Sequence, residues 1–235
     1  EGLRIAAASD LKFVMDELLP IFQRSHPEAK VAVMIDASGT LHRQILDGTR
    51  FDLFLAGDEL YPQQLVDRNL APAAGLFRFA RGGLVFWLAA STGLDPGTGL
   101  AVLLDPKVKR IAMARPNLAP YGKIAQLALR QANIEPQVEK KLLLADNLLR
   151  AAEAAQVGSA DAALLTESLV RHSSLKDRGK WQRLPAEAHP PLIQAGIVLP
   201  SSSPLAKAFR DLLTGPQGQA VLARHGYLPL RETKP

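Results

Sequence analysis

The chain has 235 residues, of which 47% are hydrophobic and 22% are charged. This balance is typical of a globular protein, and it excludes a disordered chain, a coiled coil and a collagen. Cysteine is absent, which excludes thiol catalysis, thiolate metal sites and disulfide bonds. The longest apolar run, Leu84 to Ala90, is far shorter than the roughly 20 residues of a membrane-spanning helix.

The net charge of +5 is a reason to consider nucleic-acid binding, because clustered cations release counterions from a phosphate backbone. The basic residues are not clustered, however, and mostly alternate with acidic ones, as in Glu139-Lys140-Lys141 and Lys176-Asp177-Arg178. Aromatic residues, which stack on bases, make up only 6% of the chain. The sequence therefore predicts no nucleic-acid partner.

Short apolar runs of strand length alternate with amphipathic stretches of helix length. After the first run, apolar residues recur at helical spacing from Leu11 to Phe22. The predicted strands, in chain order, are 3–8, 31–35, 51–56, 83–90, 110–114, 160–165 and 195–199. This alternation predicts an α/β fold with mostly parallel sheets flanked by helices.

Two segments, one rich in glycine and one a proline pair, are candidate crossovers between two lobes. Arg81-Gly82-Gly83 precedes a new strand and is a candidate hinge, because glycine tolerates the dihedral changes of a crossover. If the chain returns to its first lobe, Pro190-Pro191 is the candidate for the second crossover. The first lobe would then be discontinuous, with the second inserted into it.

Polar residues follow the predicted strands, where open parallel sheets bind their ligands. Most of them are hydroxyl residues or lie at predicted helix starts: Ser9-Asp10, 36–40, 57–59, 117–122, 146–148 and Thr166. Each serine could simply cap a helix. Alternatively, two serines could face one site, where hydroxyls and helix-start N–H groups would hold a small oxyanion without a counter-charge. Ser38-Gly39-Thr40 is the better candidate, because Gly39 permits close backbone approach.

Signatures of catalysis are missing. The chain has no nucleophile elbow, phosphate loop, dinucleotide fingerprint or zinc helix, and its 5 histidines lack metal-ligand spacing. His42 lies one turn after Ser38 and could act as its base, but it is expected to face solvent beside Arg43. Asp58 is expected to cap a helix rather than act as a general base. The sequence predicts a binding protein without enzyme activity and without a cofactor.

Taken together, several segments resemble the periplasmic molybdate-binding proteins of ABC importers. The similarity follows the family's order over nearly the whole chain, which makes it more specific than any single motif. The matching segments are 6–9, 37–41, 43–45, 51–59, 79–85, 120–122, 160–162, 215–220 and 225–227.

This resemblance implies the fold of a type II periplasmic binding protein, with two α/β lobes and a ligand cleft between them that closes by hinge motion. The first lobe would comprise residues 1–81 plus 191–235, and the second residues 82–190. The resemblance further implies a periplasmic chain from which a signal peptide has been removed, a membrane ABC permease as partner, and a monomer. Molybdate or tungstate would be bound as a ligand, and molybdenum would be held only as the oxyanion.

The family's ligand positions match residues of both lobes. Ser9 and Ser38 match the two hydroxyl ligands of the first lobe, and both would also donate through their backbone N–H groups. Tyr121 and Leu148 match positions of the second lobe that donate a backbone N–H. Thr166 occupies a position where many members have a tyrosine whose hydroxyl completes the site.

Two positions depart from the family pattern. Thr166 is too short to replace a tyrosine, and we hypothesise that the Tyr121 hydroxyl supplies the missing contact. Asp10 stands where many members have leucine, so an acidic residue lies beside an anion site. Its carboxylate is expected to turn away towards the helix start, while its N–H group faces the ligand. It could instead tune selectivity or lower affinity.

A site made mainly of donors favours a fully deprotonated tetrahedral dianion, because a protonated phosphate would bring an O–H group to a place that lacks acceptors. Molybdate and tungstate should therefore bind better than phosphate, with poor discrimination between the two. Sulfate or thiosulfate is the alternative ligand. An effector domain of a transcription regulator is another alternative, and it requires an attached DNA-binding region. A porphyrin-building deaminase of similar fold would need a cysteine, which this chain lacks.

Overall fold

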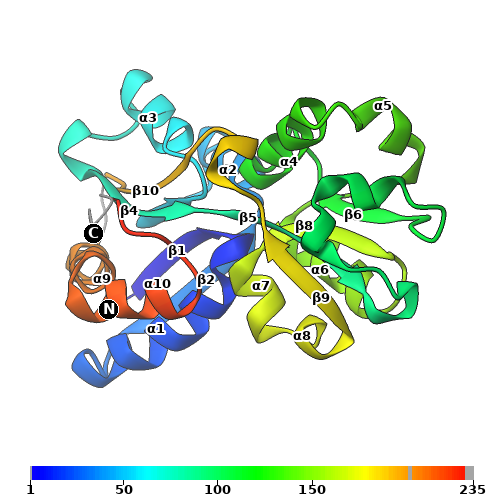
Figure 1. Ribbon diagram of the computed structural model, residues 1–235. Coiled ribbons are helices and arrows are strands. Elements are labelled where there is room, and N and C mark those ends of the chain that lie inside the picture. Colours follow the sequence, from blue (N-terminus) through cyan, green and yellow to red (C-terminus); the bar gives the residue numbers. More distant parts are fainter. Residues whose placement is uncertain (1, 201–202, 231–235) are drawn as a thin grey trace. The chain divides into compact units, whose positions relative to one another are not determined.

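The computed structural model describes residues 2–200 and 203–230. The chain divides into two compact units (Figure 1). Unit 1 comprises Glu1–Gly82 and Leu192–Pro235, and unit 2 comprises Gly83–Pro191. The chain therefore passes from one unit to the other twice, first at the pair Gly82-Gly83 and then directly after Pro191.

Unit 1 is built around a five-stranded sheet with the strand order β2-β1-β3-β10-β4. Its strands are β1 (Gly2–Ala8), β2 (Lys30–Asp36), β3 (Leu53–Ala56), β4 (Leu76–Gly82) and β10 (Leu192–Val198). Its helices are α1 (Lys12–Ser25), α2 (Ser38–Leu46), α3 (Leu60–Asp67), α9 (Pro204–Thr214) and α10 (Pro216–Arg224), with short 3-10 turns η1 (Ser9–Leu11) and η2 (Ala73–Gly75).

Helices cover both faces of this sheet (Figure 1). On one face α1, α9 and α10 pack on β1 and β3 through a core that includes Leu18, Phe22 and Phe209. On the other face α2 and α3 pack through Leu41 and Leu65, which contact Phe54 of β3. Apolar residues recur along α1 at Val14, Met15, Leu18 and Phe22, and this spacing is what buries one side of the helix.

Unit 2 contains the second five-stranded sheet, with the order β7-β6-β8-β5-β9. Its strands are β5 (Leu84–Ala89), β6 (Ile111–Ala114), β7 (Leu142–Ala145), β8 (Ala162–Thr166) and β9 (Gly179–Arg183). Its helices are α4 (Pro120–Gln131), α5 (Glu135–Val138), α6 (Leu148–Gln156), α7 (Glu167–His172) and α8 (Leu175–Arg178), with 3-10 turns η3 (Ala90–Thr92), η4 (Pro96–Thr98), η5 (Leu100–Leu104), η6 (Glu139–Lys141) and η7 (Ala186–Ala188).

The α/β prediction is confirmed, but both sheets are mixed rather than simply parallel. In unit 1, β2, β1 and β3 pair in parallel, whereas β10 is antiparallel to both of its neighbours. In unit 2, β7, β6 and β8 pair in parallel, whereas β5 is antiparallel to β8 and β9. The reversed strand of each sheet is the one that directly follows a crossover between the units.

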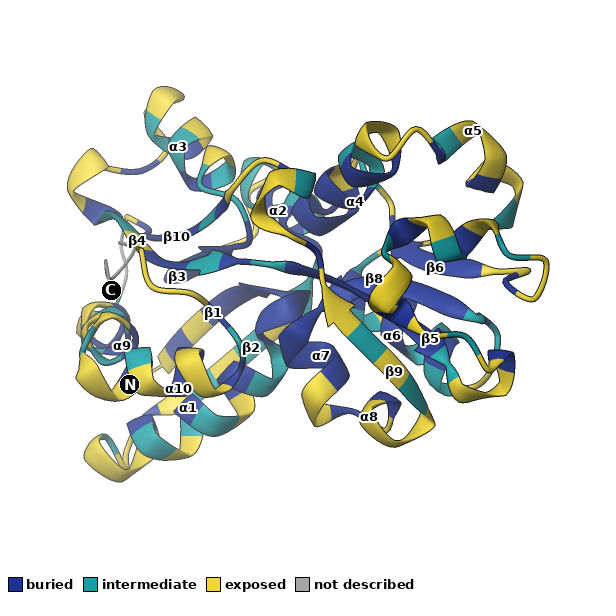
Figure 2. Ribbon diagram, viewed as in Figure 1, coloured by how far each residue is buried: buried dark blue, intermediate teal, exposed yellow. Residues whose placement is uncertain are grey.

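All seven predicted strands are present, with ends that differ by a few residues. The prediction missed β4, β7 and β9, and each of these lies at the edge of its sheet. Edge strands need no continuous apolar run, because one side of the strand meets solvent. β9 illustrates this, since its sequence GKWQR is mostly polar and is coloured as exposed and intermediate in Figure 2, beside the buried β5.

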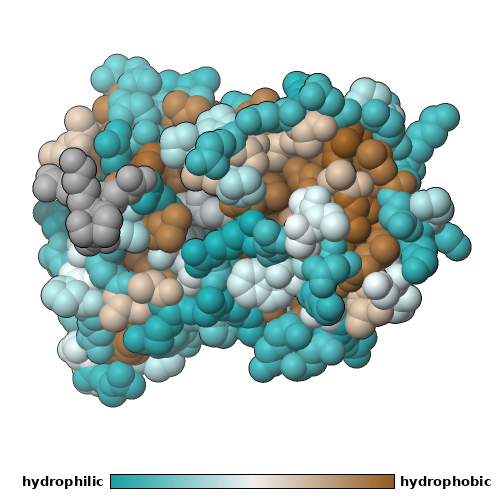
Figure 3. All heavy atoms as spheres, in the orientation of Figure 1, coloured by the Kyte–Doolittle hydropathy of each residue, from teal (hydrophilic) through white to brown (hydrophobic). Residues whose placement is uncertain are grey.

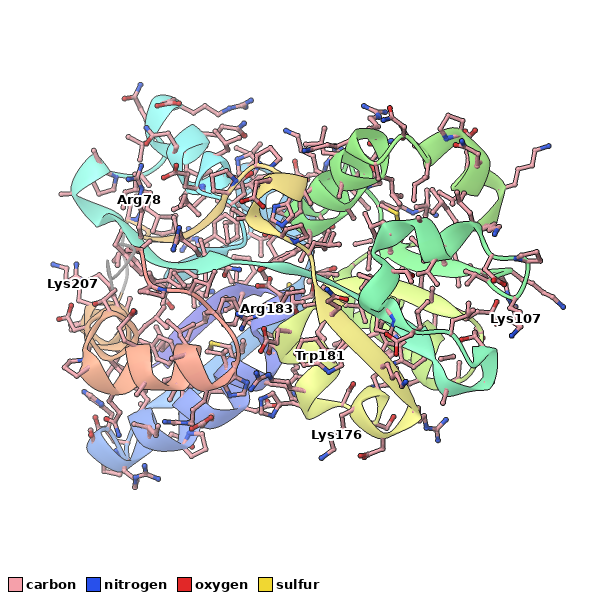
Figure 4. The ribbon with its side chains drawn as sticks, in the orientation of Figure 1. Arg78, Lys107, Lys176, Trp181, Arg183 and Lys207 are labelled. Carbon is pink, nitrogen blue, oxygen red and sulfur yellow. The ribbon has the colours of Figure 1, made fainter. Side chains whose placement is uncertain are left out.

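Within residues 2–200 and 203–230, no helix combines the length and the hydrophobicity that crossing a membrane requires. Figure 3 shows hydrophilic residues over most of the visible face, with some hydrophobic side chains gathered on unit 2. Labelled cations of one unit, such as Lys107 and Lys176 of unit 2, lie well apart in Figure 4.

Candidate functional site

In unit 1, two serines follow neighbouring parallel strands. Ser9 comes directly after β1, and Ser38 begins α2 two residues after β2. The strands pair in register with Ala8 opposite Asp36, so both serines lie at the carboxyl edge of this sheet. Both are buried, with 3% and 1% of their surface exposed. The structure thus brings together the first-lobe positions that the sequence predicted.

The Ser38 hydroxyl has a defined role as an acceptor. Its Oγ accepts a hydrogen bond of 3.0 Å from the backbone N–H of Gly57, the residue directly after β3. Because β1 lies between β2 and β3 in the sheet, this bond joins the segments that follow β2 and β3 across the end of β1. A hydroxyl has one proton to donate, and accepting from Gly57 leaves that proton directed elsewhere. Ser38 is therefore oriented as a donor.

Asp10 is buried, with 2% of its surface exposed, and neutral donors surround its carboxylate. Gln194 Nε2 donates to Oδ2 at 2.7 Å, and the Tyr227 hydroxyl lies 2.8 Å from the same oxygen. Burial raises the pKa of Asp10 above its ordinary value, and the hydrogen bonds from Gln194 and Tyr227 oppose that rise. No lysine or arginine is among the groups that shift this pKa.

Unit 2 presents an equivalent edge, built from β7, β6 and β8. Tyr121 lies in α4 after β6, Leu148 begins α6 after β7, and Thr166 is the last residue of β8. These strands pair in parallel, with Ala114 opposite Ala145. The three predicted positions of the second lobe therefore come together at the carboxyl edge of this sheet, and each is 2% exposed.

The start of α4 is fitted tightly against the end of β6. Pro120 occupies the first turn, where a missing N–H costs nothing, and Tyr121 follows it. A Cβ added to Gly122 would lie only 2.3 Å from the carbonyl oxygen of Ala114. Glycine is therefore required here for the helix start to approach the strand, and this approach fixes where the Tyr121 N–H group lies.

Side-chain caps hold two further helix starts of unit 2, those of α6 and α7. Asn147 caps α6 by accepting from the Arg150 N–H at 3.0 Å, so Leu148 presents its amide in an ordered first turn. Thr166 caps α7, and its hydroxyl lies 3.4 Å from the Leu169 N–H group. The helix-capping alternative considered for hydroxyls at strand ends thus applies to Thr166.

The carboxylate beside Thr166 differs from Asp10 in its partners. Glu167 is buried, with 4% of its surface exposed, and forms ion pairs with Arg171 on α7 and Arg183 on β9. The Arg171 guanidinium also lies 5.8 Å from the ring centre of Trp181. Figure 4 labels Arg183 and Trp181, which both belong to β9. Two guanidinium groups thus offset the charge of this buried carboxylate.

His42 and Asp58 are the two residues that the sequence analysis considered for catalysis. His42 is 7% exposed and its ring lies 5.4 Å from that of Tyr61, so the expectation that it faces solvent was wrong. Burial, with the Arg68 charge, lowers the pKa of His42. Asp58 accepts from the Leu60 N–H at 2.9 Å, but the N-cap residue of α3 is Glu59, which makes no side-chain cap. In the described part of the chain, no group of three or more His, Asp or Glu could hold a metal ion.

The residues that support these positions had only weak signals in the sequence. Gly57 was noted as a residue after a strand, but nothing indicated that it bonds to Ser38. Tyr227 lies in a segment that resembles the family, and Gln194 lies just before a predicted strand. Their shared contact with Asp10 joins residues 184 and 217 positions apart, which no local pattern reveals.

Comparison with known proteins gives a consistent result. A family model described as bacterial extracellular solute-binding protein matches residues 3–228. The molybdate-binding protein ModA of Azotobacter vinelandii is 27% identical over 227 residues, covering 96% of this chain and 89% of the relative. ModA of Rhodobacter capsulatus is 28% identical over 193 residues, covering 81% of this chain and 74% of the relative.

Solved structures show the same fold. The periplasmic molybdate-binding protein of Azotobacter vinelandii superposes with a TM-score of 0.89 at 24% identity, covering 97% of this chain and all of the other. The sulfate-binding protein SubI of Mycobacterium tuberculosis superposes with a TM-score of 0.78 at 18% identity, covering 98% of this chain and 88% of the other. At such identities these structures establish the architecture.

Proposed function

Because the chain belongs to the bacterial extracellular solute-binding proteins, a family that binds solutes rather than converting them, we propose that it captures molybdate. The observation that carries this proposal is the equivalent edge in each unit, where buried hydroxyls and helix-start amides follow three parallel strands. Such donors suit a fully deprotonated tetrahedral anion. Relatives named for molybdate binding cover most of the chain and support this choice of ligand.

In the proposed site, donors of both units bind the same anion. Unit 1 supplies the hydroxyls and amides of Ser9 and Ser38 together with the Asp10 N–H group. Unit 2 supplies the amides of Tyr121 and Leu148. The orientation of Ser38 by Gly57 supports its role, because the hydroxyl proton is then available to the ligand.

The hydroxyl of Tyr121 replaces the tyrosine contact expected at Thr166. Thr166 already accepts from the Leu169 N–H, and its side chain is too short to reach as far as a tyrosine. Tyr121 lies at the same sheet edge as Thr166. Of the two amide donors of unit 2, Tyr121 and Leu148, only Tyr121 has a side-chain hydroxyl. Thr166 is a minor contributor in this arrangement.

The wider setting follows from the family and the named relatives. We propose that the protein works in the periplasm after removal of a signal peptide, as a monomer that delivers its ligand to an ABC permease in the membrane. Tungstate binds nearly as well as molybdate, because the two anions have the same charge and almost the same size. The two units act as the two lobes of a type II binding protein.

Thermal unfolding with molybdate, tungstate, sulfate, thiosulfate and phosphate at matched ionic strength tests this proposal. A ligand at about 1,000 times its dissociation constant should stabilise the protein by about 4 kcal/mol. Shifts with molybdate and tungstate alone support the proposal. A shift with sulfate or thiosulfate alone would replace the ligand with the alternative oxyanion, and no shift with any anion would contradict oxyanion binding.

A further inference from the structure

The Asp10 carboxylate is held by two residues that are remote in sequence and have no part in the proposed anion contacts. Gln194 lies on β10 and is completely buried, while Tyr227 follows α10 and is 6% exposed. Both donate to Asp10 Oδ2, at 2.7 and 2.8 Å. The Tyr227 hydroxyl also lies 2.9 Å from the main-chain oxygen of Asp10, so one side chain contacts both parts of this residue.

The backbone fixes both donors in place. Gln194 pairs with Ala80 in the ladder between β10 and β4. Tyr227 precedes Leu228, whose N–H and carbonyl groups form hydrogen bonds of 3.0 and 2.8 Å with Arg81 of β4. The two side chains thus approach Asp10 from segments anchored to the same edge strand, and their positions do not depend on the short turn η1 that carries Asp10.

A carboxylate next to Ser9 would compete with a bound anion if it were not held in this way. Buried carboxylates need hydrogen-bond donors, because leaving a charge unsatisfied in the interior is costly. The donors at this sheet edge include those of Ser9 and Ser38, which the ligand uses in the proposed site. Ionised Asp10 facing them would both occupy these donors and repel a dianion.

We propose that Tyr227 and Gln194 are positioning residues that keep the Asp10 carboxylate away from the anion donors of unit 1. This inference rests on the proposed oxyanion function. Both residues act through Asp10 and not on the ligand. Because they are neutral, they satisfy the carboxylate without adding a cation that would favour anions of any shape.

Isothermal titration calorimetry with sodium molybdate at 25 °C tests the inference on the purified chain. Tyr227→Phe removes the hydroxyl with little change in shape, and we expect it to weaken molybdate binding about tenfold. Gln194→Met should act in the same direction. Gln219→Met is the matched control, because Gln219 Nε2 in the same unit donates to the carbonyls of Phe79 and Leu213. The control should change the dissociation constant less than about twofold, within the range of substitutions away from a site.

The distinguishing result is a rescue. In Asp10→Asn the competing charge is gone, so adding Tyr227→Phe should leave the affinity within about threefold of Asp10→Asn alone. A merely structural role of Tyr227 would give the double variant the full additional loss. Unfolding midpoints of the free variants confirm that each is folded at the temperature of titration.

Two outcomes would overturn the inference while leaving the function intact. In the first, wild type binds molybdate and the dissociation constant of Tyr227→Phe is within about twofold of the wild-type value. In the second, the affinity losses of Asp10→Asn and Tyr227→Phe add in the double variant. If sulfate proves to be the ligand, the same cycle is run with sulfate. If the wild-type chain binds none of molybdate, tungstate, sulfate, thiosulfate and phosphate, the proposed function fails and the positioning role fails with it.

Discussion

In unit 1 the proposed site uses the hydroxyls of Ser9 and Ser38 in addition to backbone amides, whereas in unit 2 it relies mainly on helix-start amides. Ser38 depends on its side chain, which is oriented by the Gly57 N–H group. Tyr121 and Leu148 depend on the backbone, which is held by the close approach of Gly122 to β6 and by the Asn147 cap. The same edge of a sheet can therefore be supplied with donors in two ways, which differ in the substitutions they tolerate.

The buried carboxylates of the two edges differ as well. Asp10 in unit 1 is held by the neutral donors Gln194 and Tyr227, while Glu167 in unit 2 is paired with Arg171 and Arg183. The Asp10 carboxylate thus has no cationic partner among the groups that shift its pKa, whereas two guanidinium groups lie against Glu167. We expect anion affinity to depend mainly on side chains in unit 1 and mainly on backbone geometry in unit 2.

Ser38→Ala should have the largest effect on affinity. It removes a donor to the anion and leaves the buried Gly57 N–H without the Ser38 oxygen. Hydrogen bonds to charged groups contribute about 1.5–3 kcal/mol, so we expect a loss of about a hundredfold in molybdate affinity by calorimetry. Ser203→Ala is the control, because Ser203 Oγ accepts from the Leu205 N–H at the start of α9 in the same unit. Equal affinities of the two variants would contradict the role of Ser38.

Gly122→Ala tests whether affinity depends on the backbone at the start of α4. The added Cβ meets the Ala114 carbonyl at 2.3 Å, so the start of α4 must shift and carry the Tyr121 amide with it. We expect a loss of more than about tenfold in affinity and a destabilisation of about 1–3 kcal/mol. Gly2→Ala serves as the control, since a Cβ there meets nothing within 4 Å. Unchanged affinity despite lower stability would show that this amide is not a ligand.

Tyr121→Phe separates the hydroxyl of this residue from its amide. If the hydroxyl replaces the missing tyrosine contact, affinity falls about tenfold, while the backbone donor is retained. Tyr61→Phe is a matched change in the other unit and should leave affinity nearly unchanged. The hypothesis is falsified if Tyr121→Phe binds molybdate as tightly as the wild type.

Leu148→Ala should affect stability more than binding. The side chain is 2% exposed, so its truncation should cost about 2–5 kcal/mol of unfolding free energy, measured in urea. The amide is retained, and the dissociation constant should change less than about threefold. A much larger loss of affinity in a folded variant would mean that the side chain, not the backbone, defines this position.

Asp10→Asn should change how stability depends on pH, and this is the smallest expected effect. Burial raises the pKa of Asp10 in the folded chain above its ordinary value of 3.8. Between these two pKa values the unfolded chain has lost its proton while the folded chain retains it, so the wild type loses stability as pH rises through this interval. The Asn variant lacks this contribution. Urea unfolding from pH 3 upward should therefore show a stability difference between the two proteins that changes with pH; parallel curves would contradict the raised pKa.

The comparison of the two units also shows which parts of the fold can be predicted from the sequence. Central strands such as β6 and β8 are buried along their whole length and read as continuous apolar runs. The edge strands β4 and β9 were not predicted because polar residues interrupt their apolar runs, whereas β7 was missed although its sequence LLLA is apolar. The reversed direction of β5 and β10 could not be predicted either, because it depends on how the chain re-enters a sheet after a crossover.

The alternation of strands and helices can be predicted from the sequence alone, as can the positions of Ser9, Ser38 and Thr166 near the ends of strands. These features are local, because side-chain periodicity and turn residues act within a few positions of each other. Three contacts could not be predicted in this way: Ser38 accepts from Gly57, His42 is buried against Tyr61, and Tyr227 donates to Asp10. These contacts join residues between 19 and 217 positions apart, and such pairs meet only when strand order and register bring their segments together.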